Sequence, residues 1–452
     1  MICHFKHQKE ELKTPLFLTI LIFKMNLSKK ICTTILSLIA LLPYLHADTI
    51  KMMQYNMMYY TTAVPSGCSV TSSYLNDKDI NLKKIIKYVQ PDIFSVNEIG
   101  SQSTYVDRIK NNVLNTDGVT YYQNCPLTNF SGGSIANMVY YDTRKLGFHS
   151  FFYITTTVRD INAYRMFYKT PQLASGDTIF ITFIVTHLKA GSYDSDKTTR
   201  AQQTAALMSK LEQIGVADNY VFSGDFNLYS SSEIAYQNLI NYSNTLYRFY
   251  DPINQPGNWN NSSQFADIHT QSTHTSSSDG CFSTGGMDDR FDFILVSPYI
   301  YFGSKKVKSV NESYHALGQD GNRLNGSINN PANTSIPDSI ANALYNFSDH
   351  LPVIVEFAID NTVSIADFED PFLVQVYNPI ENILTIELQL NEADQYTIEV
   401  YSIDGKLLLK NKNYFESGNS IFQLPFDLPS SLYIIKLQNS KKQTVVKKAV
   451  KF

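Results

Sequence analysis

The chain has 452 residues, and its 37 Lys and Arg against 41 Asp and Glu give a formal net charge of −4 at pH 7. This balance excludes the broad basic surface of a protein that stays bound to nucleic acid, although an enzyme needs only transient contact with a nucleic-acid substrate. The length is sufficient for two or more domains.

The first 47 residues have the pattern of a signal peptide. After Met25, two lysines precede an apolar run at residues 31–42, and Ala47 supplies a small residue at the cleavage position. The run is shorter than the roughly 20 apolar residues of a membrane span. We predict that residues 1–47 are removed on export, that Met25 is the true start, and that no stable membrane span remains. A two-pass membrane hairpin is the alternative.

Residues 48–360 alternate helical and strand patterns. One predicted helix has Asn76 or Asp77 as its cap and ends before Pro91. Its apolar face consists of Leu82, Ile85, Ile86 and Val89. A second predicted helix ends at Gly215. The runs "TIFITFIVTHL", "NYVFSG", "RFDFILVS" and "LPVIVEF" are apolar on both faces, as in strands that are covered on both sides, so we expect a layered α/β domain.

Each of these strands ends on, or is interrupted by, polar residues of similar chemistry. They are Asn56, Glu98, His187, Asp225, Asn227, Asp292, Asp349 and His350. Taken singly, most suit a turn, a surface acid or a hydrogen-bonded core histidine. Asp292 differs, because an acid between two phenylalanines in a strand needs a partner. Together, the carboxylates suit a hard cation and the His and Asn side chains suit phosphoryl oxygens.

The order of these motifs resembles the endonuclease/exonuclease/phosphatase superfamily, the DNase I-like enzymes. The matching pieces are an asparagine strand, "PD…E", "THL", "GDFN", "R-x-D-[FY]-[IL]-L" and "SDH-x-P". The resemblance implies a four-layer α/β sandwich, in which two facing mixed β-sheets are flanked by helices. Two departures stand out: Met58 lies where some members carry an acid of the metal site, and Asn97 replaces a glutamine.

The resemblance also implies roles for individual residues. The implied metal ligands for Mg²⁺, or for Mn²⁺ or Ca²⁺, are Asn56, Glu98 and Asp349. The implied catalytic residues are His187, Asp225, Asn227, Asp292 and His350, with Asp292 fixing and polarising His350. Arg165 is a candidate contact to the substrate phosphate. Either Asp225 or His350 takes the proton of the attacking water, and we favour Asp225.

We therefore expect a monomeric, secreted, divalent-metal-dependent phosphodiesterase that hydrolyses DNA or RNA by in-line attack of water. One alternative is a sphingomyelinase-like or other phosphoesterase that acts on lipid or sugar phosphates. A second alternative is a non-catalytic surface adhesin that retains the fold.

The end of the chain has a different pattern. After a linker at residues 361–370, residues 371–452 form short alternating segments with a hairpin signal at Asp404-Gly405, which predicts a small all-β Ig-like sandwich. The pieces "VYNPIENILTI", "IEVYSIDGKLL", "LPSSLYIIKL" and "VVKKAVKF" resemble the type A C-terminal sorting domain of the type IX secretion system. This resemblance implies that the secretion machinery is a partner and that the protein crosses the periplasm and outer membrane, to be secreted or held at the cell surface.

Overall fold

The computed structural model describes residues 48–170, 178–276, 281–360 and 372–451, the last without 379, 381 and 404. The predicted signal peptide at 1–47 and the linker at 361–370 lie outside the described residues. Among the helices that are described, none combines the length and the apolar character needed to cross a membrane.

Two mixed β-sheets form the body of residues 48–360. The strands of the first are β1 (Asp48–Tyr60), β2 (Ile93–Gly100), β3 (Tyr122–Asn124), β4 (Ile135–Asp142), β10 (Val307–Ala316) and β11 (Val353–Ile359). The strands of the second are β5 (Leu146–Ile154), β6 (Ile161–Tyr168), β7 (Phe180–His187), β8 (Tyr220–Asp225) and β9 (Asp292–Val296). Their orders are β10-β11-β1-β2-β4-β3 and β5-β6-β7-β8-β9. Each sheet has one parallel pair, β1 with β2 and β7 with β8.

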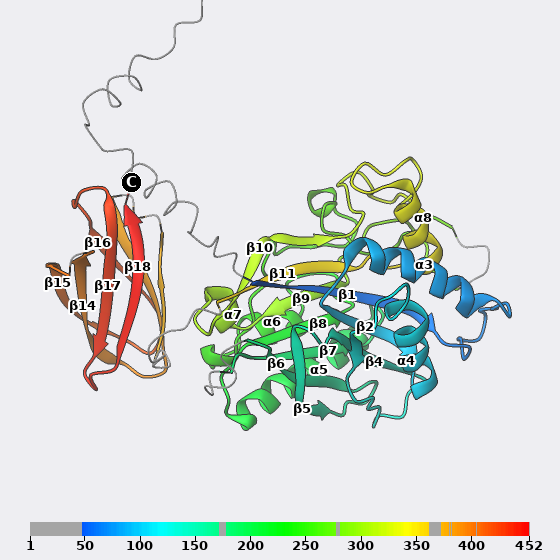
Figure 1. Ribbon diagram of the computed structural model, residues 1–452, viewed down its shortest axis with the longest axis horizontal. Coiled ribbons are helices and arrows are strands. Elements are labelled where there is room, and N and C mark those ends of the chain that lie inside the picture. The colour runs from blue at the N-terminus through cyan, green and yellow to red at the C-terminus, as the bar shows by residue number, and fades with distance from the viewer. Residues whose placement is uncertain are drawn as a thin grey trace, which may run out of the picture. The chain divides into compact units, whose positions relative to one another are not determined.

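Helices cover the outer faces of the two sheets. The main helices are α3 (Tyr74–Val89), α5 (Asp194–Ile214), α6 (Ile234–Ile240) and α8 (Asp338–Phe347). The other helical segments are α4 (Ser103–Ile109), η1 (Lys110–Leu114), η3 (Thr245–Tyr247), η4 (Ser263–Phe265) and α7 (Pro298–Phe302). Figure 1 shows α3 and α8 beside the six-stranded sheet and α5 and α6 beside the five-stranded sheet. Between these layers, β1 contacts β8 and β9, and β2 contacts β7. The predicted four-layer α/β sandwich is confirmed.

Helix α3 begins earlier than its sequence pattern predicts. Its first residue is Tyr74 and its N-cap is Ser73, so the prediction of Asn76 or Asp77 as the cap is wrong. The Tyr74 hydroxyl donates to the carbonyl oxygen of Met58 at 3.2 Å. This tertiary contact stabilises the first turn of the helix at Tyr74, which the local sequence pattern does not predict.

Strand pairing brings three of the candidate side chains into one row of the five-stranded sheet. In the parallel pair β7 and β8, His187 lies opposite Asp225. In the antiparallel pair β8 and β9, Asp225 lies opposite Asp292. Because ligands of α/β proteins bind at the carboxyl ends of parallel strands, this row marks the edge at which a site is expected.

Gly224 is required by the close approach of β7 and β8. Its φ is +146°, and a Cβ atom there would lie 1.8 Å from the carbonyl oxygen of Thr186. We expect Gly224→Ala to lower the free energy of unfolding by about 2–4 kcal/mol, because both the backbone conformation and the strand spacing would have to change. Urea denaturation of the purified protein measures this loss.

Gly215, which ends α5 as predicted, provides the matched control. It has a left-handed φ of +72°, but a Cβ atom there would meet nothing within 4 Å. Gly215→Ala therefore carries only the conformational cost of about 1–2 kcal/mol. Equal losses for the two variants would contradict the steric argument for Gly224.

The C-terminal residues form the predicted all-β domain. A three-stranded sheet, β12-β13-β16, and a four-stranded sheet, β15-β14-β17-β18, enclose a common apolar core. Gly405 has a left-handed φ of +83° in the turn between β14 and β15. The strands are β12 (Leu373–Val376), β13 (Ile383–Leu390), β14 (Asp394–Ser402), β15 (Leu407–Phe415), β16 (Gly418–Pro425), β17 (Ser431–Asn439) and β18 (Thr444–Lys451), the orange to red arrows of Figure 1.

Candidate active site

Irregularities in β1 and β2 position the first two side chains of the site. The strands pair in parallel from Met52 to Asn56, and their register then shifts before Tyr60. Glu98 has a φ of 59° and Tyr59 has a φ of 50°, which are left-handed conformations for residues with side chains. Such conformations cost about 1–3 kcal/mol each and are concentrated at functional sites. The shift turns Glu98 toward the end of the sheet, where the Tyr59 N–H donates to its Oε2 at 3.0 Å.

Asn97, next to Glu98, ties the two sheets together. Its Nδ2 donates to Asn137 Oδ1 and to the Thr186 carbonyl oxygen, both at 2.8 Å. Its Oδ1 accepts from the backbone N–H of Asp225 at 3.1 Å. A fully buried asparagine therefore fixes the spacing between Glu98 on one sheet and Asp225 on the other.

Asn56 lies between the two carboxylates. Its Nδ2 donates to Glu98 Oε1 at 3.2 Å and to Asp225 Oδ2 at 2.9 Å, and lies 3.4 Å from His350 Nε2. Its Oδ1 accepts from the Met58 N–H at 2.9 Å. In this arrangement Asn56 acts as a donor to the carboxylates, with its amide oxygen held by the irregular end of β1.

Glu98, His187 and Asp225 form a buried cluster with the geometry of a cation site. His187 Nδ1 lies 3.7 Å from Glu98 Oε1, and His187 Nε2 lies 3.5 Å from Asp225 Oδ2. One ligand atom from each residue falls within 4.8 Å of the others. Among the described residues, His187 Nδ1 has no hydrogen-bond partner although it is buried. These donors are of the kind that divalent cations bind, so the residues fit the implied metal.

The electrostatics of the cluster agree with this fit. Burial raises the pKa of Glu98, and the charge of Asp349 raises it further. Burial also raises the pKa of Asp225 to about 7, against the opposing charge of His350. Burial lowers the pKa of His187 well below its usual value, which keeps the imidazole neutral and able to bind a cation. Two buried carboxylates side by side repel each other, and a cation would relieve that repulsion.

A pH dependence of metal binding follows from the raised pKa of Asp225. Below pH 7 the metal-free protein keeps a proton on Asp225, so a cation must displace that proton. We expect the apparent affinity for Mn²⁺ to rise by up to about tenfold per pH unit between pH 5 and 7 and to level off above pH 7. Titration calorimetry in two buffers of different ionisation enthalpy measures both the affinity and the proton release.

The free energy of unfolding of the metal-free protein should fall over the same pH range, because a carboxylate with a raised pKa loses stabilisation as the pH rises toward 7. An affinity that does not change over this range would contradict the assignment.

His350 and Asp292 form a second buried pair beside the cluster. His350 Nδ1 lies 2.7 Å from Asp292 Oδ2. Burial alone would lower the pKa of His350, but the Asp292 carboxylate holds it well above its usual value. The second ring nitrogen, Nε2, faces the cluster, 3.8 Å from Asp225 Oδ2. The pair thus presents a positively charged imidazolium to the space beside Asp225.

Asn227 and Asp349 lie next to these groups. Asn227 has a left-handed φ of 51°, and its backbone N–H donates to Asp225 Oδ1 at 3.0 Å. The Asp349 carboxylate accepts from the Ser283 N–H at 2.9 Å and from Gln271 Nε2 at 3.4 Å. Asp349 is not one of the three clustered ligands, but its charge acts on Glu98.

Arg165 is not brought to the cluster. On β6 it lies opposite Thr182, five positions before His187 in the neighbouring strand. Its guanidinium forms an ion pair with Asp218 at 3.1 Å and lies over the Phe180 ring at 4.1 Å. These contacts hold the side chain away from the residues at the strand ends.

Three residues of the site carry no obvious signal in the sequence. The side-chain amide of Gln271 lies 2.6 Å from His350 Nε2, and its oxygen faces that atom when the imidazole is protonated. Arg159 donates to the carbonyl oxygen of His187 at 3.4 Å. Lys78 donates to the carbonyl oxygens of Met57, Met58 and Phe347 at 2.6–2.8 Å, and burial lowers its pKa to about 7. The one available clue was the position of Lys78, four residues before Leu82 on the apolar face of α3.

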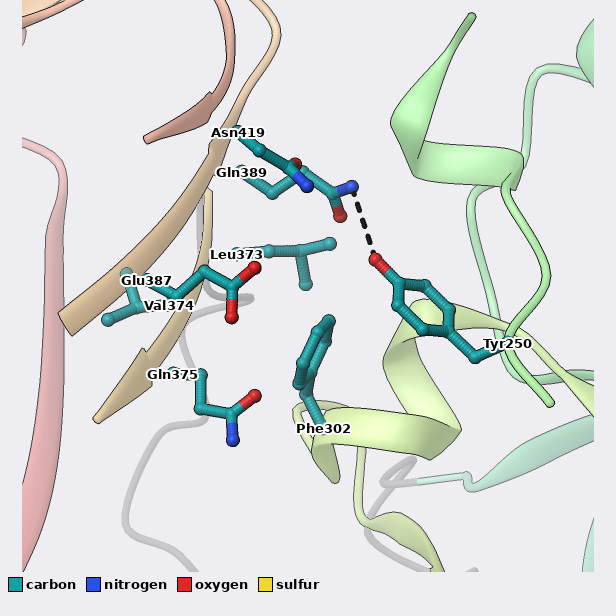
Figure 2. Close-up of a pocket in the computed structure, with 8 residues that line it drawn as sticks. All are labelled: Tyr250, Phe302, Leu373, Val374, Gln375, Glu387, Gln389 and Asn419. Carbon is teal, nitrogen blue, oxygen red and sulfur yellow. Dashed lines mark hydrogen bonds between the residues drawn. The ribbon is translucent and has the colours of Figure 1, made fainter. Parts of the chain in front are cut away.

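Two histidines of the loop before β9 are buried. A long polar loop favours solvated histidines, but His269 is 0% exposed and His274 is 3% exposed. His269 Nε2 lies 2.7 Å from the Trp259 carbonyl oxygen, and His274 stacks on the Tyr345 ring. Both histidines are therefore buried by packing contacts and are not solvated. Figure 2 labels eight other residues of the chain, and none of the candidate site residues is among them.

Comparison with known protein families identifies the end of the chain. Residues 375–451 match the family described as the secretion system C-terminal sorting domain. The chain is therefore exported through the type IX secretion system, to the cell surface or beyond it. No curated protein matches the chain.

Solved structures with the endonuclease/exonuclease/phosphatase fold are similar to the chain at low identity. The human Nocturnin catalytic domain with bound sulfate is 18% identical, with 69% of this chain and 95% of that chain covered and a TM-score of 0.42. Humanized TDP2 of D. rerio is 15% identical, with 68% and 98% covered and a TM-score of 0.41. An endonuclease/exonuclease/phosphatase from Beutenbergia cavernae is 13% identical, with 89% and 99% covered and a TM-score of 0.37. These scores establish neither an activity nor a substrate for this chain.

Proposed function

We propose that residues 48–360 are the catalytic domain of a secreted, divalent-metal-dependent phosphodiesterase that hydrolyses nucleic acid by in-line attack of water. The observation that carries the proposal is the convergence of Glu98, His187 and Asp225 in one buried cluster, beside the Asp292–His350 pair. A neutral core would not gather three carboxylates and two imidazoles at the ends of its strands, because burial of unpaired charge is costly.

Glu98 and Asp225 are the charged groups that would hold Mg²⁺, Mn²⁺ or Ca²⁺, together with His187. Asn56 and Asp349, the other ligands expected from the sequence, lie beside them. When bound, the cation neutralises charge on a non-bridging oxygen of the phosphate.

The remaining steps belong to side chains of the domain. Asp225 accepts the proton of the attacking water, because its carboxylate lies between the Asn227 backbone N–H and His350 Nε2, beside the proposed phosphate position. Asn227, held by its backbone bond to Asp225, orients that water or the phosphate. The His350 imidazolium, charged through Asp292, donates from Nε2 to a phosphoryl oxygen as negative charge increases there.

Release of acid-soluble fragments from plasmid DNA and from RNA by the mature chain, residues 48–452, tests this function. The reactions contain Mg²⁺, Mn²⁺, Ca²⁺ or EDTA. Cleavage that requires a metal and stops in EDTA is the expected result. Hydrolysis of sphingomyelin or of sugar phosphates without cleavage of either nucleic acid would replace the substrate class. Inactivity on all four substrates would leave the adhesin alternative.

A further inference from the structure

A hollow of about 370 Å³ lies beside the cluster. Three segments form it: the end of β1 with the residues that follow it, the residues before β4, and the residues before β6. Its volume falls within the range of about 300–1,000 Å³ that is usual for small-molecule sites. The proposed chemistry uses none of this space.

The hollow shares two residues with the surroundings of the catalytic cluster. Tyr59, which lines it, donates its backbone N–H to Glu98 Oε2 at 3.0 Å. Arg159, which also lines it, donates Nη1 to the carbonyl oxygens of His187 and Leu188 at 3.4 and 3.3 Å. A group bound in the hollow would therefore lie next to a phosphate held at Glu98 and His187.

Arg159 differs from most of the described arginines in forming no ion pair with a carboxylate. Arg165, Arg200 and Arg290 each form an ion pair with a carboxylate. In the part of the chain that the structure describes, the Arg159 guanidinium bonds only to main-chain carbonyl oxygens, as does that of Arg248. The half-buried Arg159 guanidinium thus forms no ion pair, although its charge acts on Glu98, and its planar donors match the geometry of a phosphate.

The walls of the hollow suit a flat, partly apolar group. Most of the lining residues are aromatic or apolar, among them Tyr59, Val64, Pro65, Ile135 and Val158, and the polar Ser134 lies with them. A nucleobase has apolar faces and hydrogen-bonding edges, which this combination accommodates. A choline head group does not suit it, because a quaternary ammonium is bound by aromatic rings and is repelled by a guanidinium.

An exposed aromatic pair lies close to the same segments. Phe130 is 59% exposed and Tyr153 is 37% exposed, and their rings stack with centroids 4.1 Å apart. The loop of Phe130 is held next to Arg159, because the N–H groups of Phe130 and Ser131 donate to the Asp160 carboxylate at 2.5 and 3.0 Å. Stacked, solvent-exposed rings are the kind of platform on which unpaired bases stack.

We propose that this hollow is the subsite for a nucleotide next to the scissile phosphate, and that the preferred substrate is single-stranded nucleic acid. Arg159 binds the flanking phosphate, the base lies against Tyr59 and the apolar wall, and a further unpaired base stacks on Phe130 and Tyr153. The inference rests on the proposed function. A base pair does not enter such a hollow, because the base must leave its stack to reach it.

Binding of a fluorescent single-stranded oligonucleotide to the mature chain in EDTA tests the subsite without catalysis. We expect Arg159→Met to weaken binding about fivefold or more and to reduce the slope of log K against log salt by about 0.7, the value for one phosphate contact. The matched control is Arg144→Met, which removes the same charge from an arginine paired with Asp142 at the other end of β4. We expect that control to bind like the unmodified chain.

A second variant removes stacking without changing charge. Phe130 lies on the surface, so Phe130→Ser should preserve folding. We expect this variant to bind the oligonucleotide about fivefold or more weakly, with an unchanged salt slope. Equal effects of Arg159→Met and Arg144→Met, no effect of Phe130→Ser, or duplex binding as tight as single-strand binding would each overturn the subsite.

Hydrolysis of bis(4-nitrophenyl) phosphate separates failure of the subsite from failure of the proposed function. This small phosphodiester has no flanking nucleotide, so its metal-dependent hydrolysis by the unmodified chain reports the catalytic cluster alone. Hydrolysis together with unaltered oligonucleotide binding in the variants would overturn only the subsite. Absence of hydrolysis on this substrate and on nucleic acid would overturn both.

Discussion

Replacing His350 with alanine is expected to lower kcat/KM for nucleic-acid hydrolysis by about 10²–10⁴-fold. The imidazole is 3% exposed and is held by Asp292, so no other group can take its position without a backbone change. Initial rates of fragment release at saturating Mg²⁺ measure the loss. His315→Ala, at an exposed histidine of β10, is the matched control and should retain full activity.

A charge-neutral change at Asp292 tests how His350 works. Asp292→Asn keeps the size of the side chain but removes the charge that raises the pKa of His350. In the variant the imidazolium should lose its proton at a lower pH, so activity should decline earlier as the pH rises. A His350→Ala variant with more than a tenth of the original activity, or an Asp292→Asn variant with an unchanged alkaline limb, would contradict the role of the pair as a charged donor.

Replacing Glu98 with glutamine is expected to weaken Mn²⁺ or Mg²⁺ binding by about 100-fold or more. Changes to groups that merely support metal ligands typically cost 10–100-fold in affinity, and Glu98 is a direct candidate ligand. Activity at a fixed, low metal concentration should fall accordingly. Titration calorimetry of the unmodified chain and of the variant gives the two affinities.

We expect Glu98→Gln to stabilise the metal-free protein, although it weakens metal binding. Glu98 is buried beside Asp225, and burial raises the pKa of both carboxylates. Removing one charge relieves the repulsion, so the melting temperature without metal should rise while the stabilisation by metal disappears. Asp194→Asn, at a fully exposed carboxylate, should change neither quantity. A lower melting temperature with intact metal binding would assign Glu98 a structural role.

Much of the architecture was predictable from local patterns. Strands that are apolar on both faces, together with a helix whose apolar face includes Leu82, Ile85 and Val89, indicated sheets covered by helices. The end of α5 at Gly215 was also predictable, because the left-handed position after a helix favours glycine. The start of α3 was not, because Tyr74 is held by a contact to Met58 at the end of β1.

The candidate site shows the same division. Residue type, position at strand ends and the resemblance to a known superfamily predicted the site residues Asn56, Glu98, His187, Asp225, Asn227, Asp292, Asp349 and His350. The structure brings Asn56, Glu98, His187, Asp225 and His350 within hydrogen-bond or ion-pair range of one another. Arg165 had the right residue type, but its pairing with Asp218 depends on a strand and a loop 53 positions apart in sequence.

The sequence alone determined which segments become strands, which faces are apolar and which strand ends carry acids and histidines, because each of these is a property of neighbouring residues. Tertiary structure decided the rest. The left-handed turn at Glu98, the approach of Gln271 to His350, and the bond from Arg159 to the His187 carbonyl oxygen arise from contacts between distant segments. Burial then set the proton affinities of Glu98 and Asp225, because removal from water, and not residue type, raises the pKa of a carboxylate.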